Sequence, residues 1–271
     1  MFTYAISGLA VILYLAAGTA LAVRLAHVST ARSSKFGVMG LGLAAALLHA
    51  ALLYDQVIAP SGLNLGFFNA VSLVAWLIAA LLLLSTLTKP VENLGIVLFP
   101  LAALTIILQM LFPSRHIFSF AHGLAGLDAH ILISVLAASL LSIAAVQAGL
   151  LALQDLRLHE KHPGGFVRAL PPLQTGENLL FQMITAGFVL LSLALITGAI
   201  FLEDIFAQHL VHKTVLSIVA WMVFAILLWG RWRFGWRGRT AIRWTLSGFV
   251  ALMLAYFGSK LVLEVVLGVN H

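Results

Sequence analysis

Residues 129–153, AHILISVLAASLLSIAAVQAGLLAL, decide the fold, because this run of 25 residues contains no charged side chain. About 20 apolar residues in helical form span the hydrocarbon of a bilayer, so the stretch predicts a transmembrane helix. Seven more windows meet the same criterion, at residues 4–23, 36–54, 65–87, 94–112, 179–202, 214–230 and 244–263. Their connections are short. The sequence therefore predicts an all-α polytopic membrane protein, with eight transmembrane helices in a single membrane domain over residues 1–271.

The composition agrees with a chain that lies almost entirely in a membrane. Hydrophobic residues make up 62% of it and charged residues 9%, whereas roughly a quarter of the residues in a soluble domain are charged. The mean hydropathy is +1.08. The absence of cysteine excludes disulfides, thiolate zinc sites, iron–sulfur ligation and thiol redox chemistry. Any cofactor must therefore be held by other side chains.

The basic residues predict the orientation. Alternate loops hold 12 of the 15 lysines and arginines, and loops of this kind face the cytoplasm. An even number of spans then places both termini outside. The net charge of +6 follows from this topology and from anionic lipid at the inner leaflet, so the lipid bilayer is an expected partner and nucleic acid is not. The basic residues in these loops are Arg24, Arg32, Lys35, Lys89, Arg157, Lys161, Arg168, Arg231, Arg233, Arg237, Arg239 and Arg243.

One cytoplasmic segment predicts a helix start. Residues 170–177 read LPPLQTGE, a rigid proline-containing approach to the sixth helix. Thr175 is a candidate cap, which would place Glu177 in the first turn of that helix.

Histidine is the residue type that points to function. The chain has ten histidines but only nine acidic residues, and imidazole is a common protein ligand of haem iron and of several other metals. On the predicted topology, seven histidines lie at or just beneath the external face, which suggests that a cofactor is handled there. These seven are His49, His116, His122, His130, His209, His212 and His271, whereas His27, His159 and His162 face the cytoplasm.

Two of these histidines are expected inside the membrane near that face. The helical rise per residue places His49 about 7 Å and His130 about 5 Å below the outer boundary, on different helices. Two imidazoles at similar depth could face each other across a planar macrocycle, and Ala45 and Ala46 leave room for its ring. The alternative is that each histidine only hydrogen-bonds to a neighbouring helix.

A second candidate site lies in the loop before the seventh window. It consists of Glu203, Asp204, His209 and His212, of which the two histidines are three residues apart and would share a helical face. Two carboxylates with two imidazoles would suit zinc, manganese or iron, although the spacing matches no strict metal motif. Solvated loop polarity is the simpler explanation.

A family resemblance is carried by several short segments. They are AHILIS at 129–134, GLLALQ at 149–154, LPPL at 170–173, LITG at 195–198, KT at 213–214, GWRGR at 235–239 and AYFGS at 255–259. Together they resemble the core of the cytochrome c assembly family, the ResC/CcsA-like haem-handling membrane proteins, and within it the YpjD-type eight-helix inner-membrane branch. The likeness covers residues 129–262 well and the first four helices in outline, where His49 fits that branch. GWRGR is its most specific element, and the simplest role for that loop is a cytoplasmic topological anchor.

The resemblance implies haem binding in or near the outer leaflet of a bacterial inner membrane, with His130 matching a family histidine. The chain also departs from the family in two ways. The external segment between the sixth and seventh windows has no tryptophan, whereas members that deliver haem have a tryptophan-rich segment there, and the family's second external histidine is absent. His212 could substitute as an external ligand without support from the family pattern, and His122 is the next candidate if His49 fails.

The expected function is therefore haem binding or haem handling, without an enzymatic reaction of its own. Haem is the expected cofactor, His130 and His49 are its favoured axial pair, and another membrane protein is a further expected partner. The alternative is a transporter, or a membrane partner of an ion-transport system, that works without haem. The residues that favour this alternative are Glu203, Asp204, Lys260 and Glu264.

Overall fold

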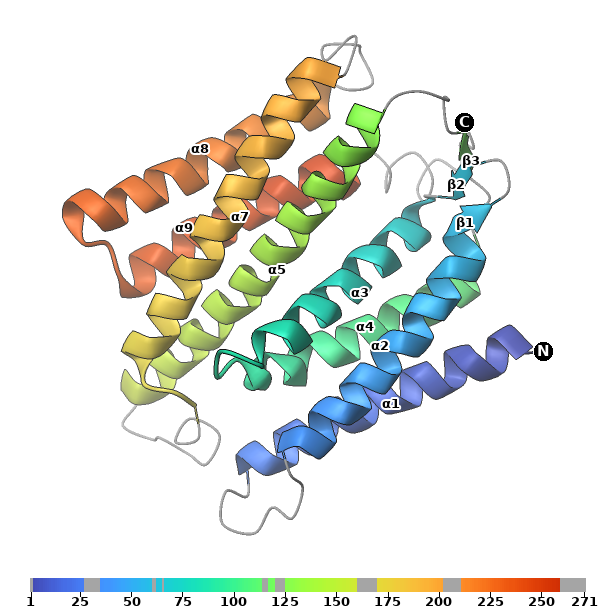
Figure 1. Ribbon diagram of the computed structural model, residues 1–271. Helices are drawn as coiled ribbons and strands as arrows, with labels where there is room; N and C mark the ends of the chain where they lie inside the picture. Colours follow the sequence, from blue (N-terminus) through green and yellow to red (C-terminus); the bar gives the residue numbers. More distant parts are fainter. Residues whose placement is uncertain are drawn as a thin grey trace. The chain divides into compact units, whose positions relative to one another are not determined.

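Eight membrane-spanning helices form in the part of the chain that the structure describes. This computed structural model describes residues 2–26, 35–59, 62–64, 66–113, 117–119, 125–159, 170–201 and 211–258. Eight of its helices are long and apolar enough to cross a membrane, which confirms the predicted spans (Figure 1). They are α1 Phe2–Ala26, α2 Lys35–Val57, α3 Phe67–Ser85, α4 Gly95–Leu111, α5 Ala125–His159, α7 Leu173–Phe201, α8 Val211–Phe234 and α9 Gly238–Met253. A 3₁₀ turn, Glu92–Leu94, precedes α4, and a π-helical turn, η2 Leu254–Gly258, continues α9.

The chain divides into two compact units of four spanning helices each. The first comprises Met1–Phe120 with Lys161–Pro171, and the second comprises Ala121–Glu160 with Pro172–His271. The first unit therefore holds α1 to α4, and the second holds α5, α7, α8 and α9. Whether both units act as one membrane domain stays a prediction.

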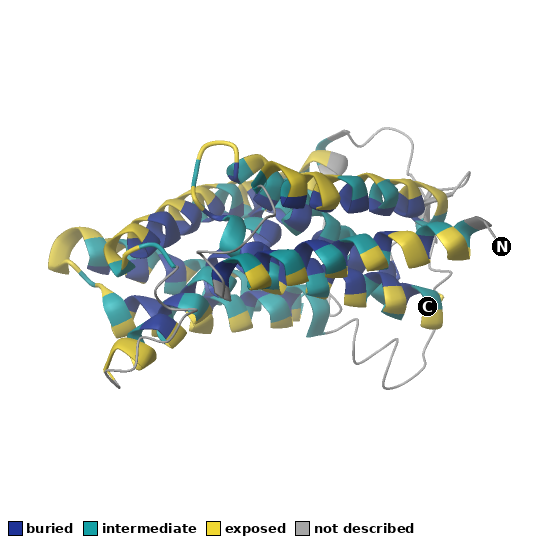
Figure 2. Cartoon of the chain, turned by 90° about the horizontal axis from the view of Figure 1, so that it is seen from below, coloured by how far each residue is buried: buried dark blue, intermediate teal, exposed yellow. Residues whose placement is uncertain are grey.

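In the first unit, small residues let neighbouring helices approach closely. Helix α1 packs against α2 and α4, and α3 packs against the same two helices. Gly42 lies so close to the ring of Phe99 that a Cβ atom at position 42 would come within 2.8 Å of it. In lipid, such close backbone approach is a main source of helix association. Buried residues line the inner helix faces and exposed residues the outer ones (Figure 2), as expected for helices with one face toward lipid.

Three short strands join the helix ends at one end of the first unit. They are β1 Ile58–Ala59, β2 Gly62–Asn64 and β3 Ile117–Ser119, and β2 pairs antiparallel with both of the others. The sheet brings together the end of α2, the start of α3 and the chain that follows α4. Hydropathy predicts none of these pairings, because strands of two or three residues have no measurable periodicity.

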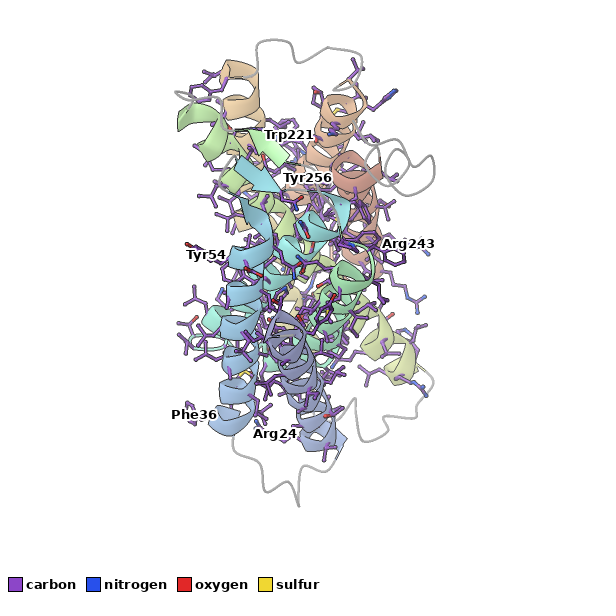
Figure 3. The ribbon with its side chains drawn as sticks, turned by 90° about the vertical axis from the view of Figure 1, so that its right-hand side faces the viewer. Arg24, Phe36, Tyr54, Trp221, Arg243 and Tyr256 are labelled. Atoms are coloured by element: carbon purple, nitrogen blue, oxygen red, sulfur yellow. The ribbon has the colours of Figure 1, made fainter. Side chains whose placement is uncertain are left out.

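In the second unit, α5 and α8 each pack against α7 and α9. Trp221 of α8 donates a hydrogen bond from Nε1 to the hydroxyl of Ser192 in α7, at 2.8 Å. The hydroxyl of Tyr256, in η2, donates to the backbone carbonyl of Ser134 in α5, at 2.7 Å. Figure 3 labels both aromatic side chains. Hydrogen bonds of this kind tie helices together where lipid offers no competing water.

The predicted topology gives a direct test with reporter fusions. A reporter after Arg168 is expected to be cytoplasmic and one after Ala207 external, because one spanning helix, α7, separates the two positions. Alkaline phosphatase and green fluorescent protein fusions would measure this. If both positions report the same compartment, the orientation and the placement of the histidines are wrong.

Candidate functional site

His130 lies in the second turn of α5 and faces α7. Its Nδ1 atom is 3.0 Å from the backbone oxygen of Ala194 and 3.2 Å from the hydroxyl oxygen of Thr197. The side chain is partly buried. The resemblance identified this residue, and the structure adds the contacts that hold its ring.

These contacts determine which ring nitrogen of His130 carries the proton. A backbone carbonyl can only accept a hydrogen bond, so the proton must lie on Nδ1. The Nε2 atom of the neutral ring then carries the free lone pair. Among the described residues, the hydrogen bonds of His130 involve Nδ1 alone. Metal-ligating histidines have this arrangement, in which the other ring nitrogen donates to a backbone carbonyl or a carboxylate.

The ends of α5 and α7 approach closely beside His130. Gly126 precedes it by one turn on the same helix face, and a Cβ atom at Gly126 would come within 2.3 Å of the ring of Phe201. Phe201 in turn follows Thr197 by one turn of α7. The glycine therefore allows the close packing that keeps this end of α7 against His130.

His49 has a different environment, in the interior of the first unit. It is fully buried, with its Nε2 atom 2.9 Å from the Ser72 hydroxyl and its Nδ1 atom 3.4 Å from the Tyr14 hydroxyl. The two ends of α2 instead present exposed aromatic side chains, Phe36 and Tyr54, which point away from the bundle (Figure 3).

Both nitrogens of His49 are therefore engaged. A neutral imidazole donates from one nitrogen and accepts at the other, so one of the two hydroxyls donates to its lone pair. To ligate iron, the ring would first have to give up Tyr14 or Ser72. In this arrangement His49 does not fit an axial ligand, and it matches the alternative in which an intramembrane histidine bonds to neighbouring helices. The pairing of His49 with His130 stays a prediction, because these residues belong to different units.

The remaining candidates lie mostly outside the described residues. His212 occupies the first turn of α8, where its side chain is exposed. His122, Glu203, Asp204, His209, Lys260 and Glu264 all fall outside the residues that the structure describes. Within the described ranges, no group of three or more histidine, aspartate or glutamate side chains could hold a metal ion. The predicted loop metal site stays a prediction.

At the end of the second unit away from His130, the buried carboxylate of Glu177 bonds to Arg237 and Gly238, and we call these three residues the Glu177 clamp. One carboxylate oxygen accepts a hydrogen bond from Nε of Arg237, and the other accepts from the backbone N–H of Gly238, both at 2.8 Å. Gly235 and Gly238 have φ angles of +66° and +54°, which glycine adopts without strain. The loop predicted to be a topological anchor thus also holds α7 against the turn between α8 and α9.

Neighbouring side chains extend this clamp. Arg239 donates from Nε to Asp155 of α5 at 2.9 Å, and Arg231 donates to the backbone oxygen of Trp236 at 3.2 Å. The guanidinium of Arg231 also lies 4.6 Å from the ring centre of Phe181, in cation–π range.

A helix begins within residues 170–177 as predicted, but the cap at Thr175 and the placement of Glu177 in the first turn were wrong. Helix α7 begins at Leu173, so Thr175 lies within it and Glu177 follows the first turn. The sequence signal for an interhelical partner was an acidic residue directly beside an apolar segment, because an unpaired charge inside the membrane is costly.

Comparison with known proteins identifies the family. Residues 38–267 match the model of the Cytochrome C assembly protein family. The chain is also 35% identical to inner membrane protein YpjD of Escherichia coli K12 over 228 residues, which cover 82% of this chain and 84% of that protein. The chain belongs to the cytochrome c assembly family. Its described residues form eight helices able to span a membrane, and it is a multi-pass protein of the bacterial inner membrane.

Two further relatives cover less of the chain. Cytochrome c biogenesis protein CcsA of Trichormus variabilis is 31% identical over 90 residues, or 32% of this chain and 26% of that protein. An uncharacterized 28.8 kDa protein of Azospirillum brasilense is 36% identical over 144 residues, or 52% of this chain and 53% of that protein. No solved structure matches the chain significantly. The family match begins at residue 38 and so includes His49 as well as His130.

Proposed function

We propose that this member of the cytochrome c assembly family binds haem and works in cytochrome c biogenesis, with Nε2 of His130 as an axial ligand of the iron. Relatives named as cytochrome c biogenesis proteins support the biological role. The hydrogen bond between Nδ1 of His130 and the Ala194 carbonyl carries the assignment of the ligand, because it leaves the Nε2 lone pair available.

The residues around His130 fit a ligand of this kind. Ala194 and Thr197 hold the ring from one side, and the side chain is only partly buried. Bound haem would supply an iron centre whose redox poise depends on its axial ligands and their hydrogen bonds. The contribution of this chain is to bind the iron, to orient the imidazole and to keep its proton on Nδ1.

The opposing ligand is proposed from the same set of histidines. His49 serves only if its ring leaves Tyr14 or Ser72, whereas His212 lies in the same unit as His130 and has an exposed side chain. His122 is the further candidate. We propose no enzymatic reaction, because binding and presentation of haem require none, and the absence of tryptophan between α7 and α8 favours binding over delivery.

An absorption spectrum tests the proposal. Protein purified in mild detergent and supplied with haem is expected to retain it through size-exclusion chromatography, with a Soret band that shifts when dithionite is added. Empty micelles mixed with haem provide the control. If the haem elutes with micelles and none remains with the protein, the proposal is wrong. The haem-free ion-transport alternative would then remain, although the acidic residues that favour it lie outside the described ranges.

A further inference from the structure

We infer that Thr197 is a positioning residue for His130, and that its hydroxyl fixes the direction in which Nε2 of His130 points. This inference rests on the proposed haem binding and adds a second residue to that site. Thr197 lies on α7, one turn before Phe201, and its hydroxyl oxygen is 3.2 Å from Nδ1 of His130.

The hydroxyl proton of Thr197 points to backbone carbonyls of its own helix. The Oγ1 atom is 2.8 Å from the carbonyl oxygen of Leu193 and 3.1 Å from that of Ala194, and both of these oxygens can only accept. The single hydroxyl proton therefore points along α7 toward these carbonyls. The lone pairs of Oγ1 remain for His130, so threonine accepts from Nδ1–H.

The proton on Nδ1 of His130 consequently lies between two acceptors. One is the Ala194 carbonyl at 3.0 Å and the other is the Thr197 hydroxyl at 3.2 Å, both on the face of α7 that meets α5. A ring held by one acceptor can still pivot about that contact. A second acceptor on the same face restricts the pivot, so Nε2 keeps one direction.

Two acceptors also change the chemistry of the ligand. Donation from Nδ1–H increases the basicity of the imidazole, and loss of such an outer partner typically lowers metal affinity by roughly 10–100-fold. Because the Ala194 carbonyl would remain, Thr197→Val should fall near the lower limit, at roughly 10-fold weaker haem binding. A less basic imidazole stabilises ferric iron less, so the midpoint potential of the bound haem should become more positive.

The chain offers matched controls for this substitution. Valine is close in shape to threonine and keeps the branched Cβ that restricts χ1 in a helix. Thr185 lies on the same helix, and its hydroxyl donates only to the carbonyl of Phe181, at 2.8 Å. Thr185→Val therefore removes an equivalent hydroxyl away from His130. Thr197→Ser keeps the hydroxyl and is expected to restore affinity and potential to near those of the unsubstituted protein.

The experiment compares haem titrations, redox titrations and low-temperature electron paramagnetic resonance spectra of all three variants. We expect weaker binding, a more positive potential and broader ferric signals for Thr197→Val alone. Equal behaviour of Thr197→Val and Thr185→Val, or failure of Thr197→Ser to restore the potential, would overturn the inference. If the unsubstituted protein binds no haem, the proposed function fails. If it binds haem through His130 and Thr197→Val changes nothing, only the positioning role fails.

Discussion

His130→Ala is expected to abolish stoichiometric haem binding, or to convert a six-coordinate spectrum into a five-coordinate one, while the protein still inserts and folds. The substitution removes an imidazole whose Nδ1 donates to the Ala194 carbonyl and whose Nε2 lone pair is therefore available to iron. If His130 made only an interhelical hydrogen bond, its removal would lower the free energy of unfolding by about 1 kcal/mol and leave the haem spectrum unchanged. Absorption spectra of the oxidised and dithionite-reduced protein distinguish these outcomes.

His159→Ala is the matched control for this prediction. His159 lies at the opposite end of α5, is largely exposed, and bonds to the carbonyl of Asp155 in its own helix. Its removal is expected to leave haem content and spectrum unchanged. Full haem occupancy with an unaltered spectrum in His130→Ala would exclude His130 as the ligand.

Glu177→Gln is expected to lower the free energy of unfolding by roughly 2–3 kcal/mol, since hydrogen bonds to charged groups contribute about 1.5–3 kcal/mol each. Both carboxylate oxygens of Glu177 accept bonds, and only 12% of its side chain is exposed. An amide has the same shape but turns a donor toward Arg237 or Gly238, which are donors themselves. The loss in free energy of unfolding is smaller than the sum of two such bonds, because the half-exposed guanidinium of Arg237 can hydrogen-bond to water instead. Thermal unfolding in detergent, followed by circular dichroism, measures the change.

Asp155→Asn is the control for the Glu177 clamp. Asp155 pairs with Arg239 at the same end of the unit, but 60% of the arginine side chain is exposed. Exposed ion pairs contribute about 0–1 kcal/mol, so the unfolding temperature of this variant should lie close to that of the unsubstituted protein. Equal destabilisation by both substitutions would show that burial of Glu177 does not determine the strength of the clamp. Neither variant should alter a haem spectrum, because His130 lies at the other end of α5.

The spanning helices could be predicted from sequence because each one carries its own apolar window. Their ends could not, since α5 continues to His159 and α7 begins at Leu173, both beyond the windows. Polar residues at a membrane interface occur in helices as well as in loops. Hydropathy therefore does not show where a helix such as α5 or α7 ends. The cap predicted at Thr175 failed for the same reason.

The candidate site was predictable only in part. The resemblance singled out His130, but its contacts with Ala194 and Thr197 join residues more than 60 positions apart. No local pattern encodes such a pairing. The depth estimate for His49 was compatible both with a ligand and with a buried hydrogen-bonding residue. The contacts of His49 with Tyr14 and Ser72, on two other helices, match the hydrogen-bonding alternative, and ligation by His49 stays a prediction.

Binding of haem iron by Nε2 of His130 can be observed directly. A structure of the haem-loaded protein in lipid nanodiscs tests it most directly. We expect iron bound to Nε2 of His130, with Nδ1 still hydrogen-bonded to the Ala194 carbonyl and the Thr197 hydroxyl. Haem bound through other residues, with His130 still facing α7 and its Nε2 unligated, would contradict it.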